Sequence, residues 1–329
     1  MNTVVVCYLY GSLLLYMVTG GADFGAGIAE LFTPADRKNH IRTLMRKLTS
    51  PIWEADHMWL ILAVVILFVG FPDTYARVST IFFIPMTLML LGIVGRGTSY
   101  AFRNADNVHD RFRNADNIIY ITSCAITPFF LGVIASSLFS GDKPSGHSFA
   151  DMYIFSWFNF FSLSAGILTV MFCGYLAMIY AMSRFPAERD RLKFQFNLLS
   201  FLFLVCIPPV VYSPVFARVL PSRFIGLPVP ALIIFVTATV LYLVWRLVYG
   251  KHSRWARLFV ILPVSFYILV VSFKRSRLPL QTDSEFHKTI DALGLILIIA
   301  SFLIIPALGY LLYKFELPQH TEQELNENK

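Results

Sequence analysis

Five ionisable side chains lie within or beside long apolar stretches of this sequence: Asp23, Glu54, Asp56, His57 and Arg96. A charged side chain inside a lipid bilayer is costly, so such groups usually mark a functional site. Carboxyl and imidazole groups that cluster in a partly buried place can pass protons between water and the interior. The chemistry to consider first is therefore proton transfer or charge pairing inside a membrane.

Asp23 lies in a glycine-rich segment, residues 20–27. Gly21 and Gly25 are four positions apart, which makes one side of a helix nearly flat and lets another backbone approach closely. Asp23 would then lie between helices, either in a proton path or paired with Arg96. The alternative is that the first two glycines end the helix and that Asp23 caps a continuation at the membrane surface.

The segment 51–60 holds two acids and a histidine. His57 follows Trp53 by one helical turn and shares a face with Glu54, so these groups and Asp56 can cluster. Such a cluster could transfer protons. The alternative is an interfacial belt in which Trp53 and Trp59 anchor the helix and the acids remain in water.

Arg96 closes an uncharged run that begins at Val78, and it has a glycine on each side. The flanking glycines indicate tight packing around a guanidinium group that pairs with an acid such as Asp23 or Glu54. The alternative is that the long side chain only reaches up to the membrane surface.

The elements that must position these residues are membrane-spanning helices. Hydrophobic residues make up 57% of the chain and charged residues 14%, a balance that excludes an ordinary soluble fold. A spanning helix needs roughly 20 mostly apolar residues. Nine stretches qualify and predict an all-α polytopic membrane protein: 3–22, 55–71, 78–98, 118–139, 154–182, 195–217, 226–247, 256–273 and 291–313.

Several prolines lie within or beside these stretches. Neighbouring helices can satisfy the carbonyl groups that a proline leaves free, so we expect kinks and not helix ends. The prolines concerned are Pro85, Pro128, Pro208, Pro209, Pro214, Pro263 and Pro306.

The net charge of +7 does not indicate a nucleic-acid partner, because the basic residues lie between apolar stretches and form no continuous stripe. Most of the 27 lysines and arginines follow the odd-numbered stretches. Basic loops favour the cytoplasmic side. We therefore expect the N-terminus outside and the C-terminus in the cytoplasm.

The chain offers little to bind a redox cofactor itself. Of its seven histidines only His57 lies within a predicted span, so no pair is available for a bis-histidine haem. The four cysteines show neither haem-attachment nor zinc spacing. If the protein takes part in redox chemistry, a partner must carry the metals.

Three motifs carry a resemblance to a known family: GADFG at 21–25, PIWEADHMWL at 51–60 and RGTSYAFR at 96–103. In order and spacing they resemble subunit II of the cytochrome bd-type quinol oxidases, the partner of the haem-bearing subunit I. The match covers roughly the first 115 residues. Glu54, Asp56 and His57 replace the family's commoner Asp, Asn and Glu.

The resemblance implies two four-helix bundles plus a peripheral helix. We expect a first bundle with the polar motifs at 1–139, the second bundle and peripheral helix at 140–318, and a polar tail at 319–329. It further implies the cytoplasmic (inner) membrane of a bacterium or archaeon. The implied partners are subunit I, small accessory subunits, and lipid or quinone.

The resemblance also implies an activity. The complex would oxidise quinol and reduce oxygen to water, with haems of b and d type in subunit I and none ligated by this chain. Asp23 and Glu54 would form a cytoplasmic proton-access path, which Asp56, His57 and Arg96 orient or tune.

Two other functions fit the same polar residues. A proton-coupled secondary transporter also uses intramembrane acids near broken helices, although the motifs show no inverted repeat. A catalytically silent scaffold would use these groups for packing alone. A haem-containing complex would favour the oxidase, and transport by the chain alone would favour the carrier.

Overall fold

The computed structural model describes residues 2–49, 53–104, 110–140, 148–219, 229–249 and 287–316, and every extended element in these ranges is a helix. The predicted all-α class is confirmed. The helices are α1 (Asn2–Leu31), α2 (Lys38–Thr49), α3 (Trp53–Gly70), α4 (Pro72–Ile81), α5 (Phe83–Asn104), α6 (Asp110–Ser140), α7 (Phe149–Tyr153), α8 (Phe160–Arg184), α9 (Arg189–Val211), α10 (Pro214–Val219), α11 (Val229–Tyr249) and α13 (His287–Glu316).

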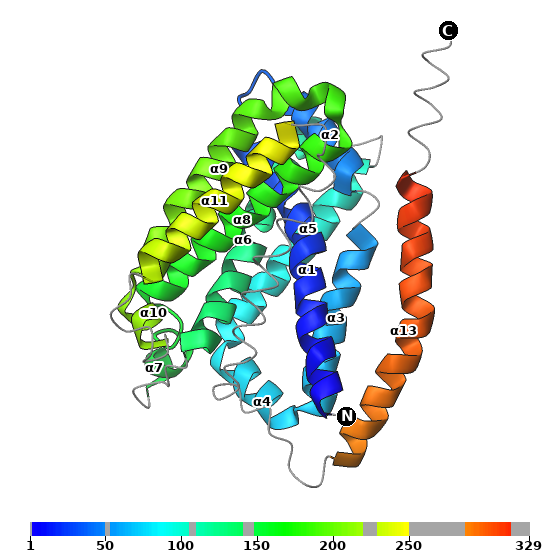
Figure 1. The fold of residues 1–329 in the computed structure, drawn as a ribbon, viewed down its shortest axis with the longest axis vertical. Coiled ribbons are helices and arrows are strands. Elements are labelled where there is room, and N and C mark those ends of the chain that lie inside the picture. Colours follow the sequence, from blue (N-terminus) through cyan, green and yellow to red (C-terminus); the bar gives the residue numbers. More distant parts are fainter. Residues whose placement is uncertain are drawn as a thin grey trace.

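The long helices run up and down through the molecule (Figure 1). Helices α1, α5, α8, α11 and α13 run in one direction, and α3, α6 and α9 run in the other. Five helices are long and apolar enough to cross a membrane: α1, α6, α8, α9 and α11. The bent pair α3 and α4 would add a sixth, and the predicted stretch 256–273 lies outside the described residues.

Two prolines end helices, which corrects the expectation of kinks. Predicted stretch 78–98 is not one helix, because α4 ends at Ile81 and α5 begins at Phe83. A proline ring clashes with the carbonyl group four residues earlier, and for Pro85 that residue is Ile81. Pro214 likewise begins α10 after α9 has ended.

The other described prolines lie inside helices, as predicted: Pro128 in α6, Pro208 and Pro209 in α9, and Pro306 in α13. Pro263 lies outside the described residues. A sharper bend separates α3 from α4, whose axes differ by 118°. Pro72 occupies the first turn of α4, where its missing N–H costs nothing.

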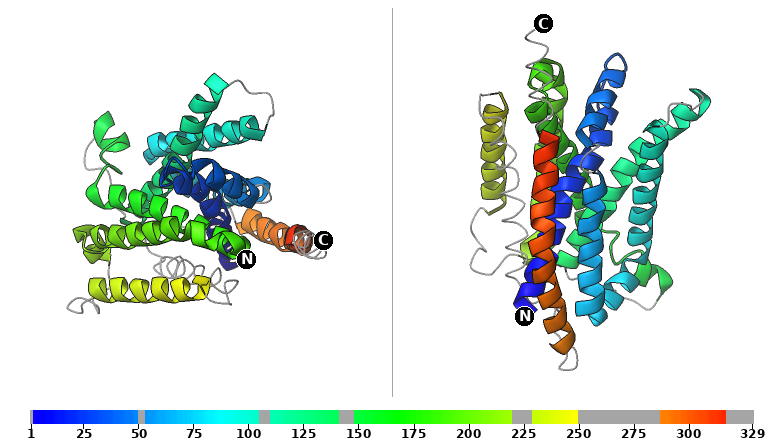
Figure 2. Two further views of the ribbon diagram at one scale, coloured as in Figure 1. Left: turned by 90° about the horizontal axis from the view of Figure 1, so that it is seen from above. Right: turned by 90° about the vertical axis from the view of Figure 1, so that its right-hand side faces the viewer.

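Helix α8 forms the centre of the fold. In its most apolar window 61% of the residues are buried, against 11% for α11. The largest core cluster joins α8 to residues of α1, α2, α9 and α11, so it crosses the boundary predicted at 139/140. Figure 2 shows α11 and α13 at the periphery.

Helix α13 is attached to α1 and α3 through a second apolar cluster that includes Val5, Ile66 and Ile290. The hydroxyl groups of Tyr8 in α1 and Ser301 in α13 lie 2.7 Å apart and form a hydrogen bond. Helix α13 is therefore tied to α1 and α3 by apolar packing and to α1 by the hydrogen bond between Tyr8 and Ser301.

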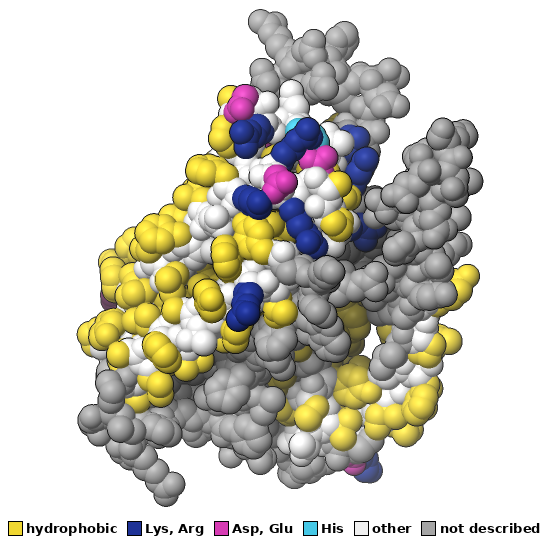
Figure 3. All heavy atoms as spheres, turned by 45° about the horizontal axis from the view of Figure 1, so that its top comes forward, with side chains coloured by type: hydrophobic (Ala, Val, Ile, Leu, Met, Phe, Trp, Pro, Cys, Tyr) yellow, Lys and Arg dark blue, Asp and Glu magenta, His cyan; other side chains and the backbone are white. Residues whose placement is uncertain are grey.

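The surface divides into an apolar flank and a charged end. Large apolar side chains are exposed along α3, α5 and α13, including Phe68, Leu91 and Phe302. Figure 3 shows that charged side chains gather at the end of the molecule where α2 lies, which we call the α2 end. This distribution suits a protein whose flank contacts lipid or other apolar chains.

Candidate functional site

A buried ion pair joins Asp23 of α1 to Arg96 of α5. Arg96 Nη2 donates to Asp23 Oδ1, and both side chains are fully enclosed. Helix α1 continues without interruption to Leu31, so the alternative in which its glycines end the helix and Asp23 acts as a cap is wrong.

The two charged residues lie at matching depths. Asp23 lies eight residues before the end of α1 at Leu31, and Arg96 lies eight residues before the end of α5 at Asn104. The two helices run in the same direction, so each residue is about 12 Å from its helix end at 1.5 Å per residue. Water at the α2 end therefore does not reach the pair directly along either helix.

Small residues bring α1 and α5 close to the same neighbour, α6. A Cβ atom added to Gly27 of α1 would overlap the side chain of Cys124, and one added to Gly95 of α5 would overlap that of Ser123. Since both helices pack tightly on α6, the long Arg96 side chain can reach Asp23. Gly27 and Gly95 thus allow this approach, whereas Gly21 and Gly25, singled out in the sequence, face α8.

Two aromatic rings flank the Arg96 guanidinium group. Its central carbon lies 5.8 Å from the ring centre of Phe24 and 5.3 Å from that of Tyr100. Cations are attracted to ring faces at such distances, and more strongly where water is excluded. The second carboxylate oxygen of Asp23, Oδ2, has no hydrogen-bond partner among the described residues.

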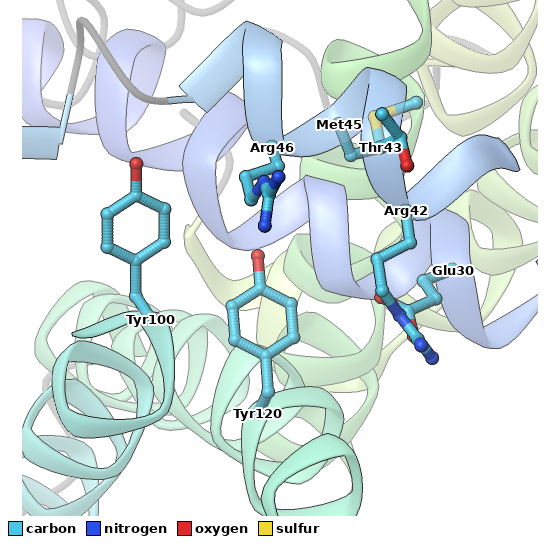
Figure 4. A pocket seen from close by; sticks show the side chains of 7 residues that line it. All are labelled: Glu30, Arg42, Thr43, Met45, Arg46, Tyr100 and Tyr120. Atoms are coloured by element: carbon cyan, nitrogen blue, oxygen red, sulfur yellow. The ribbon is translucent and has the colours of Figure 1, made fainter. Parts of the chain in front are cut away.

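A cavity of about 220 Å³ lies at the α2 end, and one of its lining residues is Tyr100, the ring beside Arg96. Figure 4 shows the tyrosine hydroxyl groups of α5 and α6 pointing towards α2 and Arg46 lying above them. The lining residues come from four helices: Glu30, Arg42, Thr43, Met45, Arg46, Tyr100 and Tyr120.

A second ion pair fixes one wall of the cavity. Glu30, in the last turn of α1, is 1% exposed. Arg42 Nε and Nη2 both donate to Glu30 Oε1, at 2.9 and 2.6 Å. A buried carboxylate without such a partner would be strongly destabilising, so the pair holds α2 against the end of α1.

The family model described as cytochrome bd terminal oxidase subunit II matches residues 1–315. The chain belongs to this family. The resemblance predicted from the three motifs is therefore confirmed, and it extends well beyond the first 115 residues.

Curated members of the subunit II family align with part of the chain. Cytochrome bd ubiquinol oxidase subunit 2 of Bacillus subtilis (strain 168) is 28% identical over 156 residues, which are 46% of this chain and 44% of that protein. Cytochrome bd-I ubiquinol oxidase subunit 2 of Escherichia coli (strain K12) is 30% identical over 168 residues, 49% of this chain and 43% of that protein. The chain thus spans less than half the length of these two relatives.

The fold of this subunit II chain also matches a solved structure. A chain in the structure of bd oxidase from Geobacillus thermodenitrificans aligns with a TM-score of 0.71 at 18% sequence identity, covering 96% of this chain and 98% of that one. The family fold therefore extends over nearly the whole sequence.

The other predicted site residues of this subunit II chain lie in the first two turns of α3, at the α2 end. His57 is half-buried, and Trp59 packs against a cluster that contains Phe24 and Tyr120. The side chains of Trp53, Glu54 and Asp56 lie outside the described residues. The structure therefore brings Asp23 and Arg96 together and places Trp59 beside them.

Sequence reasoning missed Glu30, Arg42, Tyr100 and Tyr120. The signal that could have found the first two is the apolar spacing of residues 41–48, which predicts a helix folding back on α1. Among the described residues no group of three or more His, Cys, Asp or Glu side chains could hold a metal ion.

Proposed function

We propose that this chain is the subunit II component of a cytochrome bd-type oxidase complex that oxidises quinol and reduces oxygen to water. Family membership and the common fold support this proposal. The complex would lie in the cytoplasmic (inner) membrane of a bacterium or archaeon. This chain would pair there with a haem-bearing subunit I, with the α2 end facing the cytoplasm.

The chain's part in this reaction would be a proton-access route from the cytoplasm. The observation that carries this proposal is the position of Tyr100, which lines the cavity at the α2 end and also lies against the guanidinium group of Arg96. The Tyr100 side chain therefore lies between this cavity, which water can enter, and the buried Asp23–Arg96 pair. Asp23 Oδ2 can accept a proton because no described residue donates a hydrogen bond to it.

Each charged residue then has a distinct role. Asp23 would hold the proton at its Oδ2 atom, and Arg96 would keep the carboxylate ionised between transfers by its charge and its hydrogen bond. Glu54, Asp56 and His57 begin α3 at the same end of the molecule and would collect protons from water. The buried side chains around the pair would prevent protons from leaving by another route.

The haem groups of b and d type would belong to the partner subunit. His40, the one histidine of α2, forms a hydrogen bond with Glu188 at 3.0 Å, and the described residues contain no three-ligand cluster. The residues of this chain would then serve proton transfer and contacts between subunits. When bound in the partner, the haems would supply the electron transfer.

Asp23→Asn and Glu54→Gln in the purified complex test the proton route. Both variants should consume oxygen at least tenfold more slowly per haem, while the haem absorption spectrum of the assembled complex keeps its wild-type shape. General acid–base catalysis contributes rate factors of about 10² or more, which sets the expected size of the loss in turnover. Oxygen consumption is measured with an oxygen electrode, using a synthetic quinol as electron donor.

Asp190→Asn is the matched control, because the Asp190 side chain is 86% exposed and pairs only with the nearby Lys193. It should turn over at the wild-type rate. Wild-type turnover in both Asp23→Asn and Glu54→Gln would instead favour the silent scaffold. Proton-coupled transport by the chain alone, without haem in its preparations, would favour the carrier.

A further inference from the structure

Helix α2 is an amphipathic helix that lies across the α2 end of the bundle (Figure 1). Ile41, Leu44, Met45 and Leu48 are buried, and their spacing of three and four residues forms one apolar face. The helix carries four basic residues and no acidic one, the basic residues being Lys38, Arg42, Arg46 and Lys47. A basic amphipathic helix at a membrane surface attracts anionic lipids.

The cavity beneath α2 has the chemistry of an oxyanion site. Arg42 and Arg46 are four residues apart on α2 and both line the cavity; Arg46 lies above Tyr120, and Arg42 extends to Glu30 (Figure 4). Two guanidinium groups and one carboxylate, that of Glu30, give the lining a net positive charge. Guanidinium groups match the geometry of phosphate oxygens, and hydroxyl groups can donate to them as well.

The cavity is large enough to hold a phosphate group, and the helices that line it carry exposed apolar side chains. Its volume of about 220 Å³ is more than ten times what a single water molecule needs. The two helices that carry the lining tyrosines also have exposed apolar side chains at this level, Phe102 of α5 at 59% and Ile118 and Ile119 of α6 at 66% and 49%. Acyl chains could pack on these residues, which a free anion in water would not use.

We propose that this cavity binds the phosphate of an anionic phospholipid headgroup. Arg46 and the hydroxyl groups of Tyr100 and Tyr120 donate to the phosphate oxygens. Arg42, held in place by Glu30, adds positive charge beside them. The site ties α2 to the lipid surface and does not depend on the proposed proton route.

Native mass spectrometry tests the proposed phospholipid site on the chain purified in mild detergent with the subunits that accompany it. The preparation is titrated with phosphatidylglycerol, which is anionic, and with phosphatidylcholine, which has no net charge. The wild-type protein should bind phosphatidylglycerol at least fivefold more tightly. Arg46→Gln should weaken phosphatidylglycerol binding about fivefold, as expected for one basic residue near an anionic lipid.

Lys47→Gln is the matched control, because Lys47 is the next residue of α2, is exposed and does not line the cavity. This variant should bind phosphatidylglycerol as the wild type does. Tyr120→Phe, which removes only a hydroxyl group, should also weaken binding.

Three outcomes would overturn the proposal. Equal losses in Arg46→Gln and Lys47→Gln would mean that α2 attracts lipid only through its general surface charge. Equal affinity for the two lipids would mean that the phosphate site does not discriminate charge. Displacement of the lipid by millimolar inorganic phosphate would show a site for a free anion.

Discussion

At the scale of single residues, burying the Asp23–Arg96 pair carries a large free-energy cost of desolvation. Both side chains are removed from water, and their mutual attraction, the hydrogen bond and the flanking rings help to offset several kcal/mol of desolvation. Removing one partner leaves the other as an uncompensated buried charge. Replacing both by neutral groups of similar shape avoids this cost.

Arg96→Gln should therefore destabilise the protein by about 3–5 kcal/mol, the usual cost of breaking a buried pair. The double variant Asp23→Asn with Arg96→Gln should recover much of this loss. The measurement is the thermal unfolding midpoint and the membrane yield of the complex. Arg191→Gln is the control, since Arg191 is 65% exposed in its ion pair with Glu188 and should change stability by less than about 1 kcal/mol.

Equal stability of Arg96→Gln and the wild type would contradict the interpretation that the two buried charges stabilise each other. So would a double variant that is no more stable than the single one. In either case Asp23 would be neutral in the folded protein.

The sequence offered two candidate partners for Arg96, Asp23 and Glu54, and did not itself choose Asp23, whose pairing the described side chains show. That choice depends on how closely α1 and α5 pack on α6, a contact between segments more than 90 residues apart for Gly27 and Cys124. Glu30 was missed for a similar reason. Its carboxylate is buried only because α2 folds back and supplies Arg42.

At the scale of elements, the contact between α1 and α8 depends on the absence of a side chain at Gly25. A Cβ atom at that position would overlap the backbone carbonyl group of Cys173, and it would also come within 2.8 Å of Ala177 Cβ on the next turn of α8. Backbone atoms cannot move aside as a flexible side chain can. The two helices must therefore separate if Gly25 is enlarged.

Gly25→Ala should thus destabilise the protein by about 1–3 kcal/mol, the range for overpacked cores. Gly11→Ala provides a matched control in the same helix, because nothing lies within 4 Å of the Cβ position there. It should be neutral or slightly stabilising, since alanine favours a helix more than glycine does. Thermal unfolding of the two variants in one detergent compares them directly, and equal midpoints would contradict the close packing.

The apolar stretches predicted the long helices but not the short elements. None of the nine apolar stretches includes segment 38–49, because its charges mask an amphipathic period that mean hydropathy does not detect. The break at Phe82 was missed because the stretch around it is continuously apolar. The first element depends on the spacing of its apolar residues and the second on a proline ring, and mean hydropathy detects neither.

At the scale of the whole molecule, the alternation of helix directions places most described basic residues at one end. At the α2 end lie Arg37, Lys38, Arg42, Arg46, Lys47, Arg184, Arg189, Arg191 and Lys193. Arg77 in α4 and Lys288 in α13 lie at the opposite end. Figure 3 shows the gathering at the α2 end, next to an apolar flank.

This asymmetry predicts that the α2 end faces the cytoplasm, because basic loops are retained on that side during insertion. Single cysteines at Lys47→Cys, in α2, and Ser148→Cys, beside α7 at the other end, test the orientation. Cys7 and Cys206 are first replaced by serine, since they are the native cysteines that are not buried. A membrane-impermeant thiol reagent should label Ser148→Cys in intact cells, and Lys47→Cys only after the membrane is opened. The reverse pattern would place the cavity outside, and a route from it to Asp23 could not then deliver cytoplasmic protons.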